Sequence, residues 1–570
     1  MTRRRPCPRS GRLKGQRGAA LMIMMLIMVL GTSWAVVSAV SQASRNTVKG
    51  QIQTGESLRL AKNALLGYIS QDASTSKIPG QFPCPEALSS IGTANEGKQA
   101  SSCSTLPAIG RLPWKTLGID KPLDGSGEAL WYVVSSAVRV APINFSTTGS
   151  LTLDGTANAA VAMIIAPGAA LNTVSSSDSA PSPCVKRNQS TGRNSSPLNA
   201  SDFVECGNAT LTAFVSSRND TWGNDRAVAI TATEMLIAIE GAVADRIQRV
   251  VAPALNGASA SAGWYQKNSS DEWGVNFFPY ASAWNNPTTN DSCGDYGVTE
   301  GLLPLASGDV AAGTGCSARW TSGTVTMVSG TFGSSVDSYV CTPGSALMTC
   351  VIGYTNKPTI EIATTAPNIA MGFRTRPTAD EIVFPLGYSY NPVPTPSGSI
   401  VSASGAGNFT FQSTLVNKPS GGTVTVKIPN PSDSLLLNTG ASSTSDLKWF
   451  ISNQWQRYTY YAISPAVSAN PSGTCTSVDV TNCLTLTNAV TGTGNVNDKR
   501  IALILSGRAL TGKTQPSSNL SGYFEAQNDQ TSTPGDRTFQ RDTISTIFND
   551  RPAVCPFQTQ TTGTANILCN

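Results

Sequence analysis

The first 70 residues divide into three segments by their pattern of apolar and polar positions. Residues 1–18 are polar and basic, and an uncharged apolar run then extends over Ala19–Val40. Residues 41–70 contain no proline, and their apolar positions recur at the spacing of an amphipathic helix: Val48, Ile52, Leu58, Ala61, Leu65, Leu66 and Ile69. The pattern predicts one helix over residues 19–70, about 78 Å long, which can bend at Gly31, Gly50 and Gly55.

The apolar run predicts a membrane span. Its 22 residues are enough to cross a bilayer and exceed the apolar core of a signal peptide. Seven basic residues and no acid lie in the first 18 positions, which places that end in the cytoplasm and the rest outside. A cleaved signal is the alternative, with small-residue sites at Val37-Ser38-Ala39 and Ser41-Gln42-Ala43.

The rest of the chain predicts a β-rich head with one further long helix. That helix covers residues 234–251, because Thr231 and Glu234 form a capping box and Pro253 follows its end. Short apolar or alternating runs separated by Gly, Pro, Ser and Thr predict antiparallel strands elsewhere. The fold class is therefore α+β.

Six elements occur twice in the same order, which predicts two related modules. The paired segments are 61–68 with 234–251, 82–85 with 278–280, 110–114 with 301–304, 132–138 with 461–467, 161–165 with 501–505, and 224–226 with 549–551. The first module covers residues 71–232. The second starts at 233–317 and resumes at 447–570, after an inserted β-sheet unit over 318–446 that contains the alternating runs 323–328 and 422–428. Residues 171–202 and 389–406 are predicted loops.

Composition argues against several function classes. The formal charge of +5 comes from the basic N-terminus: without residues 1–18 there are 33 basic against 35 acidic residues. Nothing therefore favours a nucleic-acid partner. Histidine is absent, which removes the usual base of a Ser or Cys nucleophile and the commonest metal ligand. Ser–Lys or paired-carboxylate chemistry stays open, but no group of residues suggests it.

Two polar motifs have both a functional and a structural interpretation. Asp124-Gly125-Ser126-Gly127-Glu128 has oxygens for calcium but does not fit a calcium loop, and a polar turn is favoured. Asn224-Asp225-Arg226 and Asn549-Asp550-Arg551 suit a catalytic or metal-binding motif or, preferably, a clasp between loop and strand that includes an Asp–Arg pair. We predict no catalytic residue, no metal site and no cofactor.

Thirteen cysteines are present, and twelve of them form six pairs of near neighbours. In an exported chain this pattern predicts disulfides, each contributing about 3 kcal/mol, with local pairing as the simplest connectivity. The pairs are Cys84 with Cys103, Cys184 with Cys206, Cys293 with Cys316, Cys341 with Cys350, Cys475 with Cys483, and Cys555 with Cys569.

The N-terminus resembles a type IV prepilin. A basic leader ends in glycine, and the tract Gly18-Ala19-Ala20-Leu21 begins the apolar helix half. The resemblance implies that a prepilin peptidase cuts after Gly18 and methylates Ala19. Major pilins have a glutamate at the position of Ile23, where it pairs with a neighbouring N-terminus. Since Ile23 cannot make that pair, a minor or tip subunit is implied.

The head carries further resemblance to pilin-like proteins of Gram-negative bacteria. It lies in the helix end 61–68, in Phe82-Pro83-Cys84-Pro85 and in the G-R-L-P-W-K-T-L-G tract 110–118. The implied partners are other pilin-like subunits and the prepilin peptidase. The implied location is the inner membrane, with a periplasmic head, and after assembly a surface filament or periplasmic pseudopilus.

The leading hypothesis is thus a structural subunit, not an enzyme, whose head serves adhesion or partner contact through an unknown host or surface ligand. One alternative is an anchored periplasmic binding protein outside any filament. Another is a secreted hydrolase with a cleaved signal, starting near Gln42 or Ser44.

Overall fold

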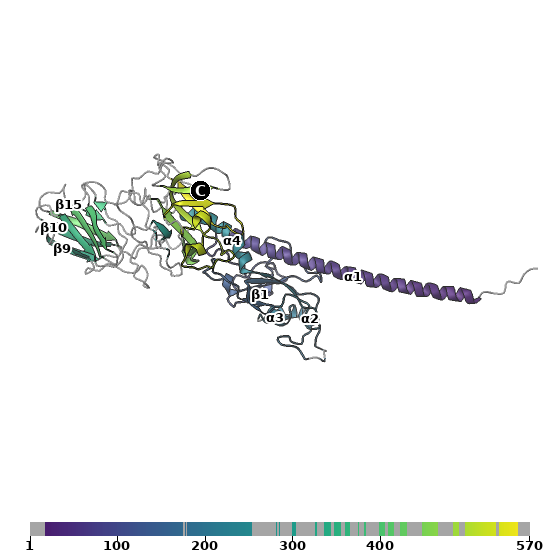
Figure 1. Cartoon of the computed structure of the whole chain (residues 1–570). Coiled ribbons are helices and arrows are strands. Elements are labelled where there is room, and N and C mark those ends of the chain that lie inside the picture. Colours follow the sequence, from purple (N-terminus) through teal and green to yellow (C-terminus); the bar gives the residue numbers. More distant parts are fainter. Residues whose placement is uncertain are drawn as a thin grey trace, which may run out of the picture.

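The computed structural model describes residues 17–252 apart from 175, 176, 178 and 212, and then positions 281, 284 and 299–303. It further describes nine strands between 325 and 429, and residues 447–556 apart from 465–482, 489–495 and 532–534. Figure 1 shows a long helix that projects from a β-rich head, with a separate group of strands at the far end of the head. The molecule is α+β.

The long helix α1 (Arg17–Asp72) is continuous through all three glycines that could have bent it. Its two halves differ in burial. Every residue over 22–34 is exposed, whereas the second half has buried positions four or three residues apart: Thr54, Leu58, Ala61, Leu65 and Ile69. This spacing gives one buried stripe on the helix. The stripe packs against the first sheet and against a second helix, α4 (Ala232–Arg246).

The first sheet is antiparallel, with strand order β1-β2-β5-β6. Its strands are β1 (Ala108–Arg111), β2 (Trp131–Val134), β5 (Ala162–Ala166) and β6 (Arg226–Ile230). Tyr132 and Ile164 face α1, while Trp131 and Met163 face a second core closed by Phe203. A hairpin of β3 (Leu151–Leu153) and β4 (Thr156–Ala160) and the short helices α2 (Gln189–Gly192) and α3 (Cys206–Thr210) complete this region.

The second sheet contains the path β7-β17-β19-β21, again antiparallel. These strands are β7 (Glu300–Leu302), β17 (Thr459–Ile463), β19 (Val496–Leu505) and β21 (Arg551–Pro556). Two more, β18 (Leu484–Asn488) and β20 (Thr538–Arg541), extend it and pair in parallel, so the head is not wholly antiparallel. Helix α4 and the π-helical turn that follows it (Ile247–Val251) pack on β21.

The two sheets share their strand register. One row of paired residues in the first sheet is Gly110, Tyr132, Ile164 and Val228. The corresponding row in the second sheet is Gly301, Tyr461, Leu503 and Ala553. Both glycines, both tyrosines and the downstream Asn-Asp-Arg tracts fall at equivalent places. The sequence match of 161–165 with 501–505 is one residue out of register, because the strands align Ile164 with Leu503.

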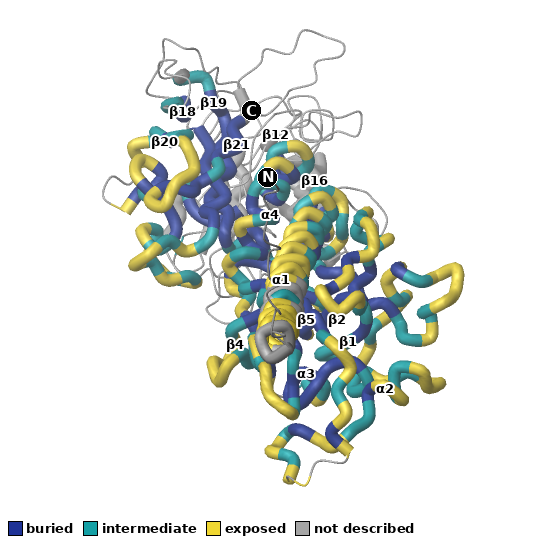
Figure 2. Tube along the Cα trace, turned by 90° about the vertical axis from the view of Figure 1, so that its right-hand side faces the viewer, coloured by how far each residue is buried: buried dark blue, intermediate teal, exposed yellow. Residues whose placement is uncertain are grey.

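One continuous core joins the helices and both sheets. Asn453, completely buried between the sheets, donates a hydrogen bond to the Lys77 carbonyl (3.0 Å) and accepts one from the Ile143 amide (3.1 Å). The guanidinium of Arg246 lies 4.1 Å from the ring centre of Trp449. Figure 2 shows the buried strands of both sheets on either side of α1, whose first half is exposed.

The nine strands between 325 and 429 form two further sheets, in agreement with β structure in the predicted insertion. The first has the order β12-β13-β16-β10-β9 and the second β14-β15-β11-β8. Their bounds are β8 (Val325–Met327), β9 (Val336–Pro343), β10 (Leu347–Tyr354), β11 (Thr359–Thr364), β12 (Arg374–Thr375), β13 (Glu381–Val383), β14 (Gly398–Ser404), β15 (Asn408–Thr414) and β16 (Gly422–Pro429).

Two loop predictions are incomplete. Residues 389–406 include strand β14, and residues 171–202 include α2 and a 3-10 turn (Ala200–Asp202). Both segments are rich in polar residues, so their composition predicts loops. The strand forms by pairing with a neighbouring strand, and the helix forms with the help of a capping side chain. For example, Asn188 caps α2 by accepting a hydrogen bond from the Thr191 amide.

Two of the predicted disulfides, Cys84–Cys103 and Cys184–Cys206, have both cysteines in the described part of the chain and are formed. Cys483 is also disulfide-bonded. In the β9–β10 hairpin the backbone pairs Cys341 directly with Cys350. The pair Cys293 and Cys316, along with Cys475 and Cys569, lies outside the described residues.

Candidate functional site

The first half of α1 carries an uncovered apolar surface. Met22, Ile23 and Trp34 are 74%, 58% and 75% exposed, and the large apolar residues between them are similarly exposed. Gly18 and Ala19 lie in the first turns of the helix, and their side chains are outside the described part. Ile23 contributes to this surface, with no acid beside it over residues 18–44. Among the described residues, no helix meets the length and hydropathy of a membrane span.

The head grips α1 where the helix enters it. Gln53 donates to the Asp124 carbonyl (3.2 Å) and Ser57 donates to the Leu123 carbonyl (2.6 Å). In return the Gly125 amide donates to the Thr54 hydroxyl (2.9 Å). The backbones touch here, since a Cβ on Gly125 would lie 2.2 Å from the Gly50 carbonyl oxygen. Glycine is therefore required at 125 for the helix to sit this close.

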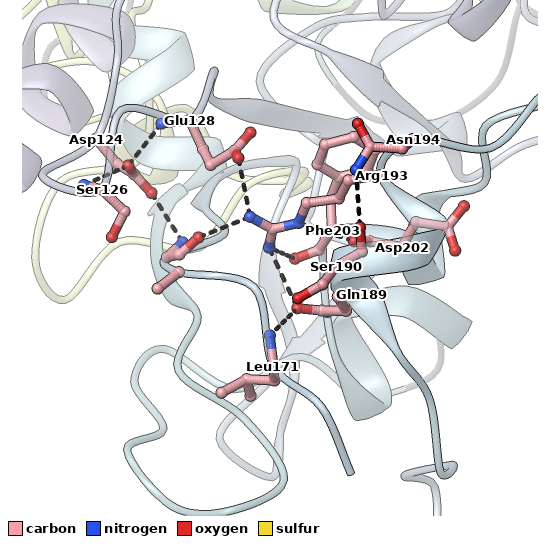
Figure 3. Close-up of polar contacts among 12 residues, drawn as sticks. Asp124, Ser126, Glu128, Leu171, Gln189, Ser190, Arg193, Asn194, Asp202 and Phe203 are labelled. Carbon is pink, nitrogen blue, oxygen red and sulfur yellow. Dashed lines mark hydrogen bonds and ion pairs between the residues drawn. The ribbon is translucent and has the colours of Figure 1, made fainter. Parts of the chain in front are cut away.

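The loop that grips α1 is itself fixed by its acidic residues. One oxygen of Asp124 accepts from the amides of Ser126 (2.8 Å) and Glu128 (3.0 Å), and the other accepts from the Gly168 amide (2.8 Å). Glu128 pairs with Arg193 at 3.0 Å (Figure 3). Protein donors thus occupy the Asp124 carboxylate, and the calcium interpretation is not supported. The described residues contain no cluster of three metal-ligating side chains.

Arg193 is the centre of this network. Its guanidinium donates to the Gly168 carbonyl (3.2 Å) and the Gln189 side chain (3.2 Å), and lies 5.2 Å from the ring centre of Phe203 (Figure 3). Gln189 in turn donates to Glu205 (2.5 Å). No motif or spacing distinguishes Arg193 from the other arginines of the chain, so sequence reasoning missed it.

The Asn224-Asp225 motif forms a buried clasp. Asp225 accepts hydrogen bonds from the Glu205 amide (2.8 Å) and from Asn208 (3.1 Å), and the Asn224 amide donates to Glu205 (3.1 Å). Burial, together with the Glu205 carboxyl, raises the pKa of Asp225 well above its usual range. The clasp between loop and strand is present, but its acid pairs with Glu205 and not with Arg226. An arginine on the next strand position points to the opposite face.

The second sheet has an equivalent clasp. Asp550 accepts from the Glu525 amide (2.8 Å) and from Asn528 (3.0 Å), and the Asn549 amide donates to Glu525 (3.1 Å). Burial, and to a lesser extent the charge of Glu525, raises the pKa of Asp550 well above its usual range. The sequence reading missed the two glutamates. The signal was a Glu-x-x-Asn tract, Glu205 to Asn208 and Glu525 to Asn528, before each Asn-Asp-Arg.

The contacts of residues 123–125 hold the second half of α1 and leave residues 22–34 of its first half uncovered. No protein-family model, curated protein or solved structure matches the chain. The resemblance to type IV prepilins therefore remains an expectation from the residues at the start of α1 and in the first module.

Proposed function

We propose that this protein is a minor pilin or pseudopilin-like subunit of a type IV pilus or a type II secretion-like filament. The observation that carries the proposal is the division of α1 into a gripped half and an uncovered apolar half. Burying an apolar side chain of this size is worth on the order of 1.5–3 kcal/mol. The uncovered half therefore needs apolar surroundings, which a bilayer supplies before assembly and neighbouring helices supply in a filament.

The same proposal assigns the processing residues. A prepilin peptidase cuts between Gly18 and Ala19 and methylates the new N-terminus, leaving the basic leader in the cytoplasm. Ile23 has no carboxylate for a neighbouring subunit's amine, which favours a minor or tip position over the shaft. The role is structural, and the head is exported for adhesion or partner contact.

We propose further that the head is built from two copies of one module. The shared strand register of the two sheets supports this, and so do the matching clasps with Asp225 and Asp550. Helix α4 then has the role over the second sheet that α1 has over the first. An enlarged head of this kind suits a subunit present in few copies.

The test is whether processing depends on Gly18. Gly18→Val is expected to keep the leader, whereas the matched variant Gly15→Val, also in the leader, is expected to lose it as the wild type does. Intact mass after expression with a prepilin peptidase distinguishes these products. If Gly18→Val were trimmed like the wild type, or if a strain without the peptidase processed the chain normally, the proposal would be wrong.

A further inference from the structure

A hollow of about 350 Å³ lies where α1 enters the head. Gly50, Gln51 and Thr54 of α1 line one side of it, and Gly168 and Ala169, just after β5, line another. The rest of the wall includes the loop 124–126, residues 217–219, and Arg226, the first residue of β6. Most of the lining is polar, so the hollow suits a hydrated or charged group.

Arg226 supplies a positive charge that is open to solvent. It is exposed, and its guanidinium makes no hydrogen bond or ion pair with the residues that the structure describes. The other charged groups of the lining are engaged: Asp124 accepts three backbone amides, and Arg218 pairs with Asp220 at 2.7 Å. Gln51 adds an amide that can donate to a bound oxygen.

In the second sheet, a carboxylate occupies the corner that corresponds to the hollow, between the covering helix and the strand that begins with arginine. The shared register places Arg551 at the position of Arg226, and Arg508 at the position of Ala169. Glu240 of α4 reaches into that corner, with its carboxylate 2.9 and 3.0 Å from Arg508 and 3.3 Å from Arg551. Over the first sheet, the residues of α1 at this corner include no acid. One corner is closed by a carboxylate from its covering helix, whereas the only acid among the described residues that line the other is Asp124, whose carboxylate accepts hydrogen bonds from backbone amides.

We infer that the hollow binds a carboxylate from outside the module, seated against Arg226 and Gln51 as Glu240 is seated against Arg508 and Arg551. The carboxylate belongs either to a small organic acid or to an acidic side chain of a second copy of this chain. Because Arg226 is exposed, a charge-assisted pair at this half-open site is weak, and its dissociation constant is obtained from a glutarate titration.

Arginine-specific labelling tests this on the purified full-length chain in a mild detergent. Phenylglyoxal modifies accessible guanidinium groups, and peptide mass spectrometry reads each arginine separately. Glutarate is the probe, with sodium chloride at equal ionic strength as the control. At ten times its dissociation constant, glutarate should slow the labelling of Arg226 roughly tenfold. Arg59, exposed on the same helix and outside the hollow, serves as the internal control and should not change.

A second variant and a dilution series complete the experiment. Gln51→Glu places a carboxylate on α1 at the hollow and should protect Arg226 without glutarate. Protection that appears on concentrating the wild-type chain alone would assign the carboxylate to a second copy, while protection by glutarate at every protein concentration would assign it to a small acid. Equal labelling of Arg226 with and without glutarate, at low and high protein concentration, would overturn the proposal.

Discussion

Replacing Glu240 with glutamine should weaken the attachment of α4 to the second sheet. Glu240 is 2% exposed and pairs with two arginines whose side chains are 21% and 27% exposed. Removing one partner of a fully buried ion pair costs about 3–5 kcal/mol. Because both arginines keep contact with water and glutamine still accepts one hydrogen bond, we expect a smaller loss, about 2 kcal/mol.

Hydrogen exchange measures this loss locally. If α4 opens as a unit, a loss of about 2 kcal/mol makes its amides exchange roughly 30-fold faster at neutral pH, since each 1.4 kcal/mol is a factor of ten. Peptides from β5 of the first sheet should be unaffected.

The matched control is Glu96→Gln, which removes the same charge from a pair with Lys121 that is 22% and 37% exposed. Glu96→Gln should change the exchange rate of the α4 amides by less than about fivefold. If Glu240→Gln altered the exchange of α4 no more than Glu96→Gln does, the Glu240 carboxylate would not be holding the helix. Glu240 would then give no support to the binding of a carboxylate beside Arg226.

Two further changes have outcomes that follow directly from the structure. Burial and Glu205 raise the pKa of Asp225, so the folded state retains a proton that the unfolded state loses. The free energy of unfolding therefore falls as the pH rises through and above the ordinary pKa range of a carboxyl group. Asp225→Asn keeps the hydrogen-bonded shape without the proton, and should flatten that fall in thermal unfolding between pH 4 and 8; an unchanged slope would show that the clasp does not hold the proton. Gly125→Ala should separate α1 from the head, since the new Cβ would meet the Gly50 carbonyl at 2.2 Å, whereas Gly55→Ala, with open space around it, should stabilise the helix by roughly 0.5–1 kcal/mol. Proteolysis of α1 in the two variants compares them, and equal resistance would contradict the close contact.

The two long helices, α1 and α4, were predictable because their signals are local. The apolar run of α1 and its later periodicity cover consecutive residues, and the capping box at Thr231 and Glu234 marks the start of α4 with both of its hydrogen bonds in place. Repetition of short motifs also predicted two related modules, and the relation between them stays a proposal.

The strand register could not be obtained in the same way. Residues 162–166 and 501–505 are buried on both faces and have no alternation of apolar and polar positions. An alignment based on apolar residues alone therefore shifted one run by one position relative to the other. A shift of one residue moves every side chain to the opposite face of a strand. The paired strands on either side fix the register, and they are distant in sequence.

The polar contacts that fix the head were the least predictable. Asn453 bonds to Ile143, 310 residues away, and Glu205 meets Asp225 across 20 residues where Glu525 meets Asp550 across 25. Hydrogen bonds between residues far apart in the sequence leave no recognisable pattern in a single sequence. The hollow beside Arg226 is of the same kind, because its walls come from α1, from the loop 124–126, from the segment after β5 and from residues 217–226.

The N-terminal residue of the mature protein tests the central claim most directly. Mass spectrometry of the N-terminal peptide, from protein isolated from the cells that make it, identifies both the cut and any methyl group. The pilin-like account predicts a chain that begins at N-methylated Ala19. A chain that begins near Gln42 or Ser44 would identify a secreted protein, and one that retains Met1 and the basic leader would identify a simple anchor; either result would contradict the account.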